Sequence, residues 1–230
     1  MATVTALCNR VCQVTGLAET GSDRSQVLGY VNQAYATSVM EAGAYTSTFT
    51  KTLTGDVGDY TFGVSPLDVT NLLEIRHLWV DDASLANRPL VRVPEYEIQA
   101  MRQAQTVAST PLYYAVRGDR QLLLYPKPLS GTTLSCVYLA SPPELVESAP
   151  ATGQESTPTA IPSVFHWDLL ANKATALALE FDNRFEESAL FDQKWSVGME
   201  RYLAYVARFG GPSIHSVGDV RYEGPRSMDA

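Results

Sequence analysis

The spacing of apolar residues changes twice along this chain of 230 residues, and this change constrains the fold more than any other feature. Near both ends apolar residues recur every three or four positions, which is typical of amphipathic helices. In the middle they alternate with polar residues, as in strands. Two short helices cannot bury enough surface alone, so the end regions need each other. The sequence predicts an α+β fold: a helical bundle from both chain ends, an inserted, mainly antiparallel β domain and an extended C-terminal arm.

Two helices are predicted in the first 45 residues. The first follows Thr3 and stops at Gly16, because glycine readily adopts the left-handed conformation that ends a helix. Its apolar positions are Val4, Leu7, Cys8 and Val11. The second has Ser22 or Asp23 as its N-cap and runs to about Glu41. Its apolar positions are Val27, Leu28, Val31, Ala34, Tyr35 and Val39.

The middle of the chain predicts a series of strands with one short helix over 95–106. The strands are expected at 47–53, 60–64, 73–80, 88–93, 112–117, 120–125 and 132–139. Gly118-Asp119 is interpreted as a two-residue hairpin turn, because glycine tolerates the positive backbone angle that such a turn requires.

The last third of the chain predicts an exposed linker, two helices and a tail. Prolines among small polar residues mark the linker at 141–160. A central helix follows Ile161-Pro162, and the next helix ends before Gly210-Gly211-Pro212. This last helix is expected to bury one apolar face against the two N-terminal helices: Trp195, Met199, Tyr202 and Val206. The predicted parts are a helical body (1–45 and 161–210), a β domain (46–140), the linker (141–160) and an arm (211–230).

Charge and cysteine content narrow the class of protein. A formal net charge of -8 argues against a protein that grips DNA phosphates. Three cysteines cannot all pair, and the first residues lack the basic start and long apolar stretch of a secretory signal. No apolar run reaches the roughly 18 residues of a transmembrane helix. We therefore expect folding in a reducing cytoplasm and no membrane span.

No motif establishes catalysis, and we expect neither a cofactor nor a metal. Phosphate-cradling glycine motifs are absent. Cys8 and Cys12 lie one helical turn apart but are interpreted as core residues, since a zinc site needs two more ligands. His166 and Asp168 could belong to a hydrolytic triad, yet no nucleophile elbow accompanies them. Asp56 and Asp59 lack the regular oxygen ligands of a calcium loop and are interpreted as turn residues.

Arg117-Gly118-Asp119 spells a tripeptide that animal adhesion receptors recognise. Three residues are a weak signal, and the same Gly-Asp pair forms the predicted turn. An adhesive or receptor-binding module that presents this hairpin is kept as one alternative function.

Several segments, taken in order, resemble the head-to-tail adaptor (connector) proteins of tailed bacteriophages, including the tail tubular adaptors of short-tailed phages. The resemblance covers about residues 1 to 210. It rests on four features in sequence order: Arg24-Ser25-Gln26-Val27-Leu28 with Asn32-Gln33-Ala34-Tyr35, then Pro111-Leu112-Tyr113-Tyr114 with Leu122-Leu123-Leu124-Tyr125-Pro126-Lys127-Pro128, then Tyr138-Leu139-Ala140-Ser141-Pro142-Pro143, and finally Ile161-Pro162 before the closing helices.

The resemblance implies a structural virion protein rather than an enzyme. It implies a homo-oligomeric ring, twelve-fold in relatives, at the head-tail junction between the portal protein and a tail or nozzle protein. DNA would pass through the centre during ejection without specific binding, and the protein would be made in the bacterial host cytoplasm. The alternatives are the adhesive module above and an undetected hydrolase that depends on His166.

The C-terminal arm is the candidate portal-binding element, since such an arm reaches into the portal in this family. Its apolar residues have nothing local to pack against, and two arginines could pair with acidic groups of a partner. The candidate portal-binding residues are Ile214, Val217, Val220, Arg221, Tyr222 and Arg226.

Overall fold

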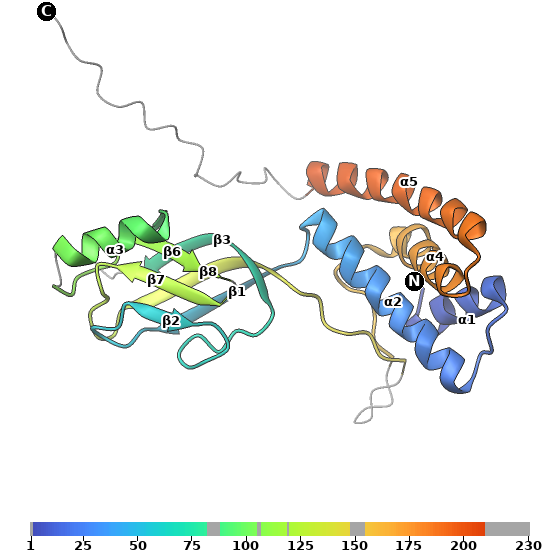
Figure 1. Cartoon of the computed structure of the whole chain (residues 1–230), viewed down its shortest axis with the longest axis horizontal. Helices are drawn as coiled ribbons and strands as arrows, with labels where there is room; N and C mark the ends of the chain where they lie inside the picture. Colours follow the sequence, from blue (N-terminus) through green and yellow to red (C-terminus); the bar gives the residue numbers. More distant parts are fainter. Residues whose placement is uncertain (1, 82–87, 105–106, 119, 148–154, 210–230) are drawn as a thin grey trace, which may run out of the picture. The chain divides into compact units, whose positions relative to one another are not determined.

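The computed structural model describes residues 2–81, 88–104, 107–118, 120–147 and 155–209. These residues form two compact units, one helical and one mainly of strands (Figure 1). The helical unit contains residues 2–45 and the described residues from 141 to 209, and the β unit contains the described residues from 46 to 140. The predicted α+β class is confirmed.

Two capped helices begin the helical unit. In α1 (Val4–Thr15) the Thr3 hydroxyl accepts a hydrogen bond from the Ala6 amide, and Gly16 ends the helix with φ 83°. In α2 (Gly21–Ala42) the N-cap is Thr20, so the expectation of Ser22 or Asp23 was wrong. Asp23 instead lies within the first turn of α2, and its carboxylate accepts a hydrogen bond from the Ala18 amide. The helix dipole favours a negative charge at this end of a helix.

The second half of the helical unit begins with an irregular turn. A 3₁₀ turn, η1 (Ser163–Phe165), leads into a π-helical turn, η2 (His166–Ala171), and then into α4 (Asn172–Phe181). The last helix is α5 (Phe185–Phe209). One core joins the two parts of the helical unit, and its largest fully buried members are Leu7, Tyr35, Leu145, Ile161, Leu169 and Tyr202.

The inward face of α5 follows the predicted spacing in part. Met199 and Tyr202 are buried, whereas Trp195 and Val206 are only half-buried against the same core. The Trp195 indole donates a hydrogen bond to the Ser38 hydroxyl at 3.1 Å. The helix packs chiefly against α4, and also against α2 and η2, so the expected packing against both N-terminal helices holds only for α2.

The predicted linker does not run free over its described residues. Leu145 is buried in the helical core, and its backbone N–H and C=O both bond the Asn32 side chain, at 2.6 and 3.0 Å. Glu147 forms an ion pair with Arg24. Ala160 lies between two tyrosines, donating to the Tyr35 hydroxyl and accepting from the Tyr202 hydroxyl. The expectation of an exposed linker is therefore wrong for these residues, because their backbone polar groups are satisfied inside the unit.

The β unit contains two four-stranded sheets. The first has the order β1-β8-β3-β4, formed by β1 (Thr46–Thr52), β8 (Thr133–Ala140), β3 (Leu72–Asp81) and β4 (Arg88–Pro89), and all its pairs are antiparallel. The strands that begin and end the insertion are neighbours, with Thr46 opposite Leu139. The chain therefore enters and leaves the β unit at one place.

The second sheet has the order β2-β7-β6-β5 and is covered on one face by a helix. It consists of β2 (Asp59–Thr61), β7 (Gln121–Tyr125), β6 (Tyr113–Arg117) and β5 (Val91–Arg92). The helix α3 (Glu95–Ala104) packs against β6 and β7, with Ile98 against Ala115 and Leu123 (Figure 1). Because side chains alternate along a strand, the buried Leu122 and Leu124 lie on the opposite face of β7.

Two details of the second sheet differ from expectation. β5 pairs with β6 in parallel, since α3 returns the chain to the same edge. In the β6–β7 pair Arg117 lies opposite Gln121, which leaves three residues in the connection rather than the expected two. Gly118 has φ 59°, as the turn prediction required.

The shared core of the helical unit can be tested with one chemical change at two sites. Leu169→Ala removes a fully buried side chain and should destabilise the helical unit by about 3–5 kcal/mol. Leu203→Ala on the exposed side of α5 should change stability by less than about 0.5 kcal/mol. Urea unfolding followed by circular dichroism at 222 nm measures both, and equal losses would show that the assigned core is wrong.

Candidate functional site

The candidate portal-binding arm lies outside the described residues. This applies to all six residues predicted for it: Ile214, Val217, Val220, Arg221, Tyr222 and Arg226. The portal-binding role therefore stays a prediction. The remaining candidate sites lie in described parts of the chain.

His166 lies in the helical core rather than in a catalytic cleft. Its side chain is fully buried, with Nε2 2.8 Å from the Ile161 carbonyl oxygen and Nδ1 3.3 Å from the Ala2 carbonyl oxygen. Asp168 is half-exposed and has its carboxylate 4.0 Å from an Arg201 nitrogen. Both imidazole nitrogens thus contact backbone, and the ring links the start of the chain to the start of η2. This geometry favours a structural role for His166 over the base of a triad.

All three cysteines are buried and free. Burial raises the pKa of the Cys8 thiol from 9.0 to about 12, with the Glu147 carboxylate adding to the shift and Arg24 opposing it. Burial raises the pKa of Cys136 to about 12 as well. A protonated thiol is a poor nucleophile and a poor metal ligand. Cys8 and Cys12 therefore belong to the core of the helical unit, as the sequence indicated.

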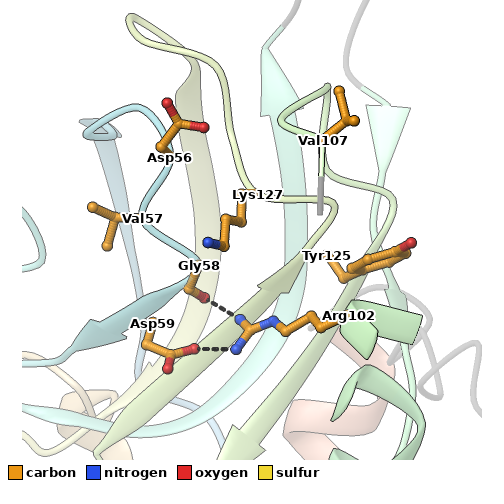
Figure 2. Close-up of a pocket in the computed structure, with 8 residues that line it drawn as sticks. All are labelled: Asp56, Val57, Gly58, Asp59, Arg102, Val107, Tyr125 and Lys127. Carbon is orange, nitrogen blue, oxygen red and sulfur yellow. Dashed lines mark hydrogen bonds and ion pairs between the residues drawn. The ribbon is translucent and has the colours of Figure 1, made fainter. Parts of the chain in front are cut away.

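The two aspartates of the Gly58 turn, Asp56 and Asp59, line an open pocket of about 500 Å³ in the β unit. Figure 2 shows Asp56, Asp59, Lys127 and Arg102 around it. Arg102 comes from α3 and holds the turn: its guanidinium forms an ion pair with Asp59 at 2.7 Å and donates to the Gly58 carbonyl at 2.8 Å. It also donates to the Leu124 carbonyl at 3.1 Å. Asp59 is thus neutralised by a cation, which disfavours calcium binding.

Gly58 lets Arg102 approach the turn. A Cβ at this position would lie 2.5 Å from Nη2 of Arg102 and 3.3 Å from a side-chain carbon of Lys127. The Arg102 Nε is buried and has no hydrogen-bond partner among the described residues, so the guanidinium bonds the turn through its other nitrogens. The arrangement uses the pocket residues to fasten α3 to β2 and β7. The sequence alone does not reveal this contact, because Arg102 and Gly58 are 44 positions apart.

The Arg117-Gly118 tip offers little to a receptor. Arg117 donates through Nε to the Glu95 carboxylate at 2.6 Å and through Nη1 to Gln121 at 3.4 Å. The arginine that an adhesion receptor would need is already paired within the β unit. Asp119, the third residue of the tripeptide, lies outside the described residues.

Metal-binding clusters and membrane-spanning helices were also considered for the part of the chain that the structure describes. No cluster of three or more histidine, cysteine or acidic side chains there has the arrangement of a metal site. None of the helices described combines the length and hydropathy needed to span a membrane.

Comparison with known proteins identifies the family. A family model described as SU10 adaptor protein matches residues 2–215. Since this match spans more than half of the chain, the chain belongs to the SU10 adaptor protein family. The family consists of structural virion proteins of bacteriophages, which confirms the resemblance to head-to-tail adaptors and places the protein at the head-tail junction. A search of curated proteins found no match.

Substitution of Gly58 tests how tightly Arg102 holds the turn. Gly58→Ala should displace the guanidinium and destabilise the β unit by about 1–3 kcal/mol. Hydrogen exchange of the β7 amides reports this loss within the β unit. Gly29→Ala is the matched control, because a Cβ there would have nothing within 4 Å and alanine suits a helix better by roughly 0.5–1 kcal/mol. Unchanged hydrogen exchange of the β7 amides in Gly58→Ala would show that Arg102 does not hold the turn.

The thiols provide a prediction about reactivity. At pH 8 the folded chain should react with iodoacetamide far more slowly than the urea-unfolded chain at Cys8 and Cys136, because their raised pKa keeps the thiols protonated. Peptide mass spectrometry measures modification at each site. Rapid labelling of Cys8 in the folded chain would show that α1 does not pack as described.

Proposed function

We propose that this chain acts as a ring-shaped adaptor between the portal protein and a tail or nozzle protein, with DNA passing through its centre. Family membership over residues 2–215 is the observation that carries this proposal. Twelve copies per ring is the expected number, by resemblance to relatives. Synthesis in the host cytoplasm before assembly fits the three free, buried cysteines.

The acidic balance of the chain supports a passive channel. A net charge of -8 provides no general excess of cations to displace the counterions of DNA. A ring of such chains can surround a polyanion without retaining it. We therefore propose that duplex DNA moves through the ring without specific binding.

The division of the chain suggests how the parts contribute. In this proposal the helical body over 1–45 and 161–210 forms the ring wall, and the β domain over 46–140 is an appendage of that wall. The segment 141–160 joins the two and is fixed to the wall by Leu145 and Glu147.

The C-terminal arm is proposed to dock on the portal. Four apolar residues, Ile214, Val217, Val220 and Tyr222, follow the Gly210-Gly211-Pro212 sequence that is unfavourable to a helix. An extended segment can place alternate side chains in pockets of a partner. Arg221 and Arg226 add charge that acidic portal groups could pair with. The family match ends at residue 215, within the arm over 211–230.

Truncation tests the proposed docking. A chain lacking residues 213–230 should keep its helical circular dichroism, because every described core residue of the helical unit is retained. It should fail to co-sediment with portal-bearing heads, while a chain lacking only residues 227–230 should bind as the full chain does. Electron microscopy of the bound complex shows whether a ring has formed at the portal.

Two outcomes separate the parts of this proposal. If the 213–230 deletion co-sediments as well as the full chain, the arm is not the docking element. If the full chain itself never binds portal-bearing heads, the adaptor function proposed here is wrong.

A further inference from the structure

The helical unit separates its charges along α5 and the turn before it. From Glu180 to Asp192 five acidic residues accompany one basic residue, Arg184, whereas from Gln193 to Phe209 three basic residues accompany one acidic residue, Glu200. The cations recur every seventh position, at Lys194, Arg201 and Arg208. Residues seven apart lie about two turns apart on one side of a helix. The second half of α5 therefore presents a basic stripe.

This stripe belongs to the exposed side of α5 and includes apolar residues. Leu190 and Val197 are 58% and 43% exposed, with Lys194 between them and Arg201 one turn beyond Val197. Leu190 and the buried Met199 are nine residues apart, about two and a half turns, so they lie on opposite sides of the helix. We call this surface the basic face and define it as Leu190, Lys194, Val197, Arg201, Ala204 and Arg208.

The turn between α4 and α5 carries the opposite charge. Phe181 and Phe185 are 66% and 60% exposed and lie among acidic side chains. Arg184, the one cation there, is paired with Glu187. The pKa of Glu187 is lowered by its hydrogen bond from Arg184, so that pair carries no net charge at neutral pH. We call this surface the aromatic corner and define it as Glu180, Phe181, Asp182, Phe185 and Glu186.

The aromatic corner is held in a defined conformation. Asn183 adopts φ 60°, and the Arg184 amide donates to the Leu179 carbonyl at 2.9 Å. The Arg184 guanidinium donates to the Thr15 carbonyl at the end of α1 at 3.0 Å. The Phe181 ring lies against Tyr30 of α2, with centroids 6.4 Å apart. Little ordering is needed for such a corner to dock.

We propose that the aromatic corner of one chain docks on the basic face of a second copy of the same chain. Each surface combines exposed apolar side chains with charge of one sign, and the two signs are opposite. The two surfaces differ, so the contact is head-to-tail and leaves one of each free on every pair. Repetition of such a contact closes into a ring when the rotation between copies closes. This inference rests on the proposed ring and assigns its subunit contact.

A second copy fits the basic face better than DNA does. Leu190 begins the face and Val197 lies between Lys194 and Arg201, and a phosphate backbone would leave the apolar surface of both unused. The phenylalanines of the corner can cover these apolar side chains while Glu180 and Asp182 meet Lys194 and Arg201.

Charge exchange between the two surfaces tests the proposal. The first variant, Lys194→Glu with Arg201→Glu, has two acidic surfaces. The second, Glu180→Lys with Asp182→Lys, has two basic surfaces and places lysines at the C-terminal end of α4, where a helix favours them. Each variant alone should self-associate at least about tenfold more weakly than the original chain, because like charges then meet. A mixture of the two should associate to within about threefold of the original chain, because every contact is again between opposite charges.

Analytical ultracentrifugation of the full chain measures association, and circular dichroism checks that each variant is folded. The matched control is Arg88→Glu with Arg92→Glu, which changes two exposed residues of the β unit. It alters the net charge as the first variant does and should leave association unchanged. Variants that assemble separately as well as the original chain would overturn the proposal. A mixture that associates as weakly as either variant alone would also overturn it. This conclusion holds as well if Lys194→Glu with Arg201→Glu loses affinity for duplex DNA. Failure of the adaptor function is read separately, from binding to portal-bearing heads.

Discussion

The pairing of β1 with β8 is the constraint on which the rest of the structure depends. Thr46 and Leu139 lie opposite each other, so the insertion of 46–140 begins and ends at one place. Only because the chain returns there can residues 2–45 and 141–209 share a core. The apolar faces of α1 and α2 depend on this return, since Leu169 and Tyr202 from beyond the insertion complete their core. The insertion is thus compatible with the helical unit because its first and last strands are neighbours.

The return of the chain is fixed by polar contacts that composition does not reveal. Asn32 satisfies both backbone groups of Leu145, and two buried tyrosines satisfy both backbone groups of Ala160. Prolines and small polar residues at 141–160 predict exposure when their neighbours in space are unknown. A polar side chain presented by a distant helix reverses that expectation, because it replaces the water that such a backbone needs.

Local signals in the sequence predicted the regular elements well. Gly16 ended α1, and the spacing of Met199 and Tyr202 identified the buried side of α5. Contacts between distant residues were beyond such signals. The parallel β5–β6 pair depends on how α3 returns the chain, and the half-burial of Trp195 depends on Ser38 of α2.

The candidate sites also divide into those that local spacing reveals and those that depend on distant residues. Cys8 and Cys12 were correctly interpreted as core residues, since their helical spacing already placed them on the apolar side of α1. The partners of Arg117 and Asp59, which are Glu95 and Arg102, lie on α3 and could not be inferred from the turns alone. The resemblance to phage adaptors contributed what local chemistry could not, and the family match over residues 2–215 confirms it.

Placing the basic face of α5 between subunits reconciles two requirements of an adaptor ring. A wall that conducts DNA must not retain it, yet separate subunits with a net charge of -8 repel one another. A head-to-tail contact uses the few clustered cations, Lys194 and Arg201, to offset that repulsion where subunits meet. The same contact removes these cations from any surface that DNA could reach. Each contact can be weak, since a closed ring gives every subunit two of them and the loss of one subunit requires both to break together.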